Sequence, residues 1–215
     1  MIKTVTANLI IFSLVITLIS VTQPATLNAV DDSINVNLTV DSGISITSPS
    51  DVTMSNLGTS VNTSTGSAIW NVKTNDPDGY SLSVRASASP AMVSGGNSFL
   101  DYTEATPGTP DTWSVDSGTI QFGFSGLGTD VVNVNSDRFA ATGQTTCDNG
   151  SASSTVNSTI RFLGFETSNQ TLATRSATTT TSGVNTTICF AAGQNGVYAP
   201  AGTYQAVITA TAVAL

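Results

Sequence analysis

The stretch AIWNVKTNDPDGYSLSVRA, residues 68–86, consists of two alternating runs of apolar and polar residues joined by a short turn signal. Alternation with a period of two is typical of a β-strand with one buried face. Between the runs, Pro77 favours the first angles of a turn and Gly79 accepts a positive φ. The stretch predicts a β-hairpin whose strands pair side by side through the large residues of one face: Trp70 and Val72 with Tyr80, Leu82 and Val84.

Seven further runs alternate or form short apolar segments, and clusters of Gly, Pro, Asn and Asp separate them. No stretch after residue 29 keeps a helical period, and the helix formers Glu, Lys and Leu are scarce. We therefore expect an all-β protein, an antiparallel β-sandwich of Ig-like or jelly-roll-like type. The further expected strands span residues 34–40, 44–46, 119–125, 130–134, 158–165, 186–192 and 203–215.

The N-terminus has the three parts of an export signal. Lys3 supplies the basic start, residues 9–21 form an uncharged apolar core, and the small residue Ala29 stands at the expected cleavage position. A run of this length suits a signal peptide better than a bilayer-spanning helix, which needs about 20 residues. Counted from Val5 to Val21 the run is longer, so an uncleaved N-terminal anchor is the alternative. We expect residues 1–29 to be a cleaved signal peptide and 30–215 to be a single secreted domain.

The composition after residue 29 is acidic but sparsely charged. Five basic residues face fourteen acidic ones there, so the net charge is −9, and only 9% of the whole chain is charged. Nucleic acids and anionic lipids bind to clustered Lys and Arg. We therefore expect neither nucleic acid nor a membrane surface as a partner, and no stable membrane span after cleavage.

The chemistry of a common active site is missing from the sequence. There is no His, the most frequent general base and the usual partner of a nucleophilic Ser or Cys. Asp101 with Glu104, or Asp76 with Asp78, could still form a catalytic carboxylate pair, although both pairs stand in turn-forming contexts. We expect a non-catalytic protein that needs no cofactor.

The cysteines and the Asp76–Gly79 turn each allow a structural and a functional interpretation. Cys147 and Cys189 are the only cysteines, and in an oxidising compartment they predict one disulfide, with two free buried thiols as the alternative. Asp76 and Asp78 could belong to a calcium loop, but the spacing fails the EF-hand pattern and favours a plain turn. No metal site is expected.

Two aromatic residues are candidates for a ligand platform. Trp113 lies in a predicted loop, where its ring could stack on a sugar, although a loop Trp often folds back on the core. Tyr80 stands at the start of the second predicted strand, and we name it as the second candidate.

Two terminal segments are candidates for assembly between molecules. Residues 34–40 place Ile34, Val36, Leu38 and Val40 on one face, directly behind the expected cleavage position. The final strand, 203–215, is apolar on both faces toward its end. Such strands either lie inside a monomer's own sheets or pair with the open sheet edge of a neighbour.

Two stretches carry resemblances to bacterial surface proteins. TSTGSAIWNVKTNDPDGYSLSVRASA, residues 63–88, resembles the strand, turn and strand of WxL-type cell-wall proteins, and APAGTYQAVITATAVAL, residues 199–215, resembles their closing Gly-x-Tyr strand. The same ending is similar to spore-coat-U-type, pilin-like and camelysin-like fibre proteins. These resemblances imply a secreted cell-surface β-sandwich, either a structural subunit of a fibre or coat or an adhesin-like module. Its partners would be copies of itself, joined by strand addition, or a cell-wall glycan such as peptidoglycan.

Overall fold

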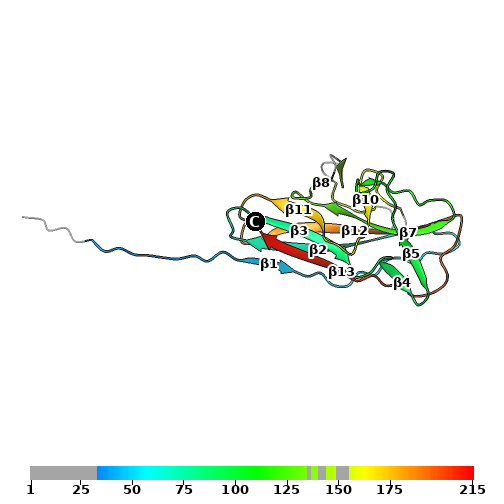
Figure 1. Ribbon diagram of the computed structural model, residues 1–215, viewed down its shortest axis with the longest axis horizontal. Coiled ribbons are helices and arrows are strands. Elements are labelled where there is room, and N and C mark those ends of the chain that lie inside the picture. The colour runs from blue at the N-terminus through cyan, green and yellow to red at the C-terminus, as the bar shows by residue number, and fades with distance from the viewer. Residues whose placement is uncertain (1–32, 135–136, 140–143, 149–154) are drawn as a thin grey trace, which may run out of the picture. The chain divides into compact units, whose positions relative to one another are not determined.

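A computed structural model describes residues 33–134, 137–139, 144–148 and 155–215 (Figure 1). The expected signal peptide, residues 1–29, lies outside this described part. The described residues form strands, turns and irregular segments and no α-helix, so the all-β expectation is confirmed. Nothing in that part of the chain is a helix long and apolar enough to cross a membrane. Asp41–Leu215 forms one compact unit, to which the described residues before Asp41 do not belong.

The described residues of the compact unit form thirteen strands in chain order. They are β1 (Ile44–Thr47), β2 (Thr63–Thr74), β3 (Tyr80–Ala86), β4 (Met92–Ser94), β5 (Asn97–Asp101), β6 (Asp111–Thr112), β7 (Thr119–Leu127), β8 (Asn133–Val134), β9 (Asp137–Arg138), β10 (Arg161–Gly164), β11 (Gln170–Arg175), β12 (Val184–Asn195) and β13 (Ile208–Ala214).

The large sheet has the order β1-β2-β12-β7-β10-β6, and β5 pairs in parallel with β7 at its side and carries β4. Strand β12 is its centre: it pairs antiparallel with β2 from Val184 to Gly193 and with β7 from Thr187 to Asn195. Both faces of β7 and β12 are largely buried. A strand buried on both faces reads as a nearly continuous apolar run, which explains the sequences FGF of β7 and ICFAA of β12.

The small sheet has three strands in the order β11-β3-β13, and both pairings are antiparallel. Its β3 alternates strictly, with Tyr80, Leu82, Val84 and Ala86 buried. These side chains join those of β2, β7 and β12 in a single hydrophobic cluster. The two sheets therefore share one core, with stacked phenylalanines at its centre, such as Phe124 on Phe165 with ring centroids 4.5 Å apart.

The pairing predicted for residues 68–86 is wrong, although the turn itself is confirmed. Gly79 has φ +88°, and its N–H donates to the Asp76 carbonyl at 3.1 Å. However, β2 pairs with β1 and β12, whereas β3 pairs with β11 and β13. The turn thus carries the chain from one sheet to the other. Trp70 and Leu82 are both buried because they belong to the same core from opposite sheets, and not because their strands lie side by side.

The expected strand at residues 34–40 is also absent. These residues have no regular structure, and Ile34, Val36 and Leu38 are each 87% exposed. Alternation makes a segment suitable for a sheet, but a strand forms only when a neighbouring strand satisfies its backbone groups. Elsewhere the boundaries shift: β2 and β12 are longer than expected, and regular pairing in the C-terminal segment begins only at Ile208.

Candidate functional site

The Asp76 carboxylate of the Asn75–Gly79 turn accepts hydrogen bonds from the turn itself and from the segment just before β1. Asp76 accepts hydrogen bonds from the Asp78 N–H at 3.0 Å and from the Ser42 hydroxyl at 2.8 Å. Asn75 Oδ1 accepts a hydrogen bond from the Gly43 N–H at 2.7 Å, and Asn75 Nδ2 donates to the Asp41 carbonyl at 2.8 Å. Within the described residues, no group of three or more His, Cys, Asp or Glu is placed to hold a metal ion.

Asp101 and Glu104, the other carboxylate pair considered, bind different backbone segments. Asp101 accepts from the Ala91 N–H at 2.9 Å and from the Ser89 hydroxyl at 2.7 Å. Glu104 accepts from the N–H of Gly164 on β10. Both side chains therefore tie loops to the large sheet.

The two candidate platform residues lie in different places. Tyr80 is fully buried between the sheets, and its hydroxyl donates to Asp130 at 2.9 Å. Trp113 is half-buried on the opposite face of the large sheet, stacked on Tyr102 with ring centroids 4.8 Å apart. The Trp113 ring lies over Gly123 and Gly193, where any Cβ would crowd it. Tyr80 offers no exposed ring face in this arrangement, and a ligand role for Trp113 stays a prediction.

The disulfide between Cys147 and Cys189 is present, as the sequence predicts, with a Cα–Cα distance of 5.4 Å. Cys189 is fully buried in the middle of β12, on the face away from the main core. Together with Ile160 and Phe162 it forms a second, smaller hydrophobic cluster. The bond therefore fastens the segment around residue 147 to the outside of the central strand.

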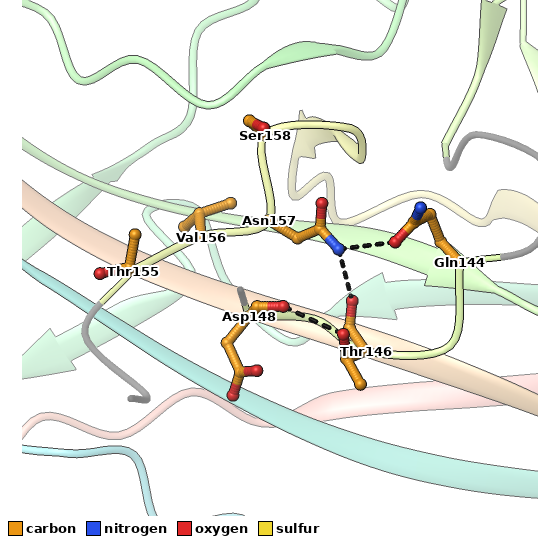
Figure 2. Close-up of a pocket in the computed structure, with 7 residues that line it drawn as sticks. All are labelled: Gln144, Thr146, Asp148, Thr155, Val156, Asn157 and Ser158. Carbon is orange, nitrogen blue, oxygen red and sulfur yellow. Dashed lines mark hydrogen bonds between the residues drawn. The ribbon is translucent and has the colours of Figure 1, made fainter. Parts of the chain in front are cut away.

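An open pocket lies next to this disulfide segment (Figure 2). Its described lining is polar apart from Val156, and Asn157 links its two halves: the Asn157 amide donates to Gln144 Oε1 at 2.7 Å and to the Thr146 carbonyl at 3.3 Å. Asp148 is its single titratable side chain among these residues. The lining brings together no acid–base pair and no apolar platform. The pocket consists of Gln144, Thr146, Asp148, Thr155, Val156, Asn157 and Ser158.

Unlike the residues above, the β13 edge of the small sheet has backbone N–H and C=O groups that no described strand pairs with. Strand β13 pairs with β3 and with no other strand of the described part of the chain. The Ser87 N–H donates to the Val207 carbonyl at 3.0 Å, and the Leu215 N–H donates to the Gly79 carbonyl at 3.2 Å. Residues of an antiparallel strand alternate in the side to which their N–H and C=O groups point. Odd-numbered residues therefore bond to β3, and the outward-pointing ones are Ile208, Ala210, Ala212 and Ala214.

The side chains of this C-terminal segment also leave apolar surface exposed. On the core face they are mostly small, and Ala210 and Ala212 are only partly buried against the main core. On the outer face Val207, Val213 and Leu215 are 54%, 55% and 57% exposed. The sequence correctly predicted that both faces of this segment are apolar. It carries no signal for which residues point their backbone groups away from β3, because nearly every residue has the same N–H and C=O groups.

The segment Ile34–Val40 is the second place where large apolar side chains are exposed. Its four large side chains are between 73% and 87% exposed on alternate positions. Immediately after it, Asp41, Ser42 and Gly43 are held to the Asn75–Asp76 turn by the hydrogen bonds described above. The first residues of the compact unit are thus held by hydrogen bonds, and the apolar segment directly precedes them in the sequence.

Comparisons with protein-family models, with curated proteins and with solved structures found no match for this chain. Function is therefore inferred from the residues themselves.

Proposed function

We propose that this chain is a non-catalytic extracellular surface protein that serves as a structural subunit of a fibre or coat. In this proposal residues 1–29 are a cleaved signal peptide, and the compact unit is a β-sandwich of Ig-like or jelly-roll-like type. The disulfide supports export, because such bonds persist mainly in oxidising compartments.

One observation carries the assembly function: the exposure of Ile34, Val36, Leu38 and Val40 in a chain whose compact unit needs none of them for its core. Large apolar side chains exposed together mark an interaction surface. Burying four such side chains would contribute on the order of 6–12 kcal/mol before the loss of motional freedom is subtracted. Their period of two fits a strand that enters the sheet of another copy.

Electron microscopy and light scattering of the secreted protein test this function. The wild-type protein should form fibres or large oligomers. The variant Ile34→Ser/Val36→Ser/Leu38→Ser should remain monomeric, with an unchanged melting temperature, because these side chains are exposed and belong to neither described hydrophobic cluster. A matched control, Asn35→Ser/Asn37→Ser/Thr39→Ser, alters the polar face of the same segment and should assemble like wild type. Monodisperse wild-type monomers at every concentration would remove the proposal.

A further inference from the structure

We infer that the acceptor for this assembly is the free edge of β13, where Ile34–Val40 of a second copy adds as a fourth strand of the small sheet. This inference rests on the proposed function and specifies its partner surface. It assigns the role of acceptor to the C-terminal strand and the role of donor to the N-terminal segment.

The backbone of β13 provides a full row of hydrogen-bonding groups. Four residues in the strand direct their N–H and C=O groups away from β3, and no described segment pairs with them. The strand has seven residues, and the donor Ile34–Val40 also has seven. One donor therefore covers the whole edge without an overhang. The four outward-pointing residues are Ile208, Ala210, Ala212 and Ala214.

The side chains of the two segments complement each other in size. The core face of β13 carries Ala210 and Ala212, small residues that pack against the main core and are only partly buried. The donor carries Ile, Val, Leu and Val on one face. Added beside the alanines, these larger side chains would cover the part of Ala210 and Ala212 that is still exposed.

Charge does not oppose the contact. The protein is acidic, yet neither Ile34–Val40 nor the whole segment after Arg175 contains a charged residue. Edge strands of soluble proteins usually carry Lys, Pro or a bulge that prevents pairing with another molecule. β13 has none of these, and its pairing register with β3 is regular over its whole length.

The other edges of the sheets fit the donor less well. β11 is already partly paired, because the Val132 N–H donates to the Leu172 carbonyl and the Thr174 N–H donates to the Asp130 carbonyl. At the two ends of the large sheet, β6 has only two residues and β1 only four. Of the strands that stand last in their sheets, β13 is the longest, and its outer side is unpaired with any described strand along its whole length.

Entry of the donor requires a small movement of β1. Cα atoms of β1 and β13 come within 8 Å of each other, although no hydrogen bond joins the two strands. An inserted strand needs two spacings, roughly 9.6 Å in total. The β1 edge must therefore shift outward by roughly 2 Å or more, which is feasible for a four-residue strand bonded on one side only.

Proline substitution separates the two sides of β13. Ala212→Pro removes an N–H that points away from β3, so the small sheet keeps its internal hydrogen bonds while the edge loses a donor group. Thr211→Pro, one residue earlier, removes an N–H that bonds to β3 and should destabilise the monomer. We expect Ala212→Pro to keep its near-UV spectrum and to lower the sedimentable fraction at least tenfold.

Mixing defective variants tests the direction of the contact. Ala212→Pro retains a donor, and the variant Ile34→Ser/Val36→Ser/Leu38→Ser retains an acceptor. Neither should assemble alone, but together they should form a 1:1 heterodimer that does not grow. Should Ala212→Pro fail to fold, Ala210→Lys serves instead, because it places a charge on the same edge and keeps every backbone group.

The outcomes distinguish the two proposals. If wild type assembles and folded Ala212→Pro and Ala210→Lys assemble equally well, the acceptor lies elsewhere and this inference is overturned, whereas the proposed function stands. If the wild-type protein does not assemble, both the proposed function and this inference are overturned. Wild-type fibres together with a 1:1 heterodimer from the two defective variants would support both.

Discussion

The Tyr80 hydroxyl donates a 2.9 Å hydrogen bond to the carboxylate of Asp130, which also lies 3.4 Å from the Arg175 guanidinium. The Asp130 carboxylate therefore joins the segment that follows β7 to Tyr80, the first residue of β3, and to Arg175, the last residue of β11. The Asp130 side chain is 10% exposed, so its carboxylate depends on protein partners for most of its hydrogen bonds.

Replacing Tyr80 with Phe should lower the free energy of unfolding by about 1.5–3 kcal/mol, because a buried carboxylate loses a donor. Urea denaturation followed by fluorescence measures this change. Tyr198→Phe is the matched control, since Tyr198 is 63% exposed, and its unfolding midpoint should equal that of wild type. Equal midpoints for both variants would contradict a structural role of the Tyr80–Asp130 bond.

Stability should fall at alkaline pH because of the buried tyrosines. Burial, together with nearby carboxylates including Asp111, raises the pKa of Tyr102 from 10.0 to about 12, and burial and Asp130 raise the pKa of Tyr80 as well. The unfolded chain therefore ionises first. The stabilising effect is complete below pH 10 and decreases between about pH 10 and pH 12. Urea midpoints across this range should fall less steeply in Tyr102→Phe than in wild type; identical slopes would argue against the effect.

Gly79→Ala should be strongly destabilising. Gly79 has φ +88°, and a Cβ there would lie 2.0 Å from the Arg175 carbonyl oxygen. The turn cannot open without separating β3 from β11, so we expect a loss of at least about 2 kcal/mol. Gly96→Ala is the control, because a Cβ at Gly96 meets nothing within 4 Å. A melting temperature of Gly79→Ala as high as that of Gly96→Ala would refute the close approach.

Removing the disulfide should lower the free energy of unfolding by about 4 kcal/mol in the chain-entropy description, given the 42-residue separation of the cysteines. The double variant Cys147→Ala/Cys189→Ala avoids leaving a single buried thiol. Thermal unfolding of this variant should match that of reduced wild-type protein. A reduced protein as stable as the oxidised one would show that the disulfide does not contribute to the free energy of unfolding.

Several features of the fold could be predicted from short-range patterns. Alternation located β3 with its bounds correct, and Pro77 and Gly79 located the turn before it. The even cysteine count predicted the disulfide. These signals are local, since a period of two, a turn conformation or a thiol pair in an oxidising compartment depends on few other residues.

Strand partners could not be predicted in the same way. A buried face fits equally well beside a neighbouring strand or across a core, which is why Trp70 and Leu82 suggested a hairpin and proved to lie in opposite sheets. The alternation of Ile34–Val40 indicated a strand, yet no described strand pairs with it. Both differences concern long-range pairing.

The sequence by itself determined that this chain is built from strands, where its first sheet-changing turn lies, and which faces of its last strand are apolar. Only the tertiary structure decided that β13 is an edge and which of its residues point their backbone groups outward. The physical reason is that apolar side chains specify burial without specifying a partner, whereas backbone hydrogen bonds specify a partner but are identical at almost every residue.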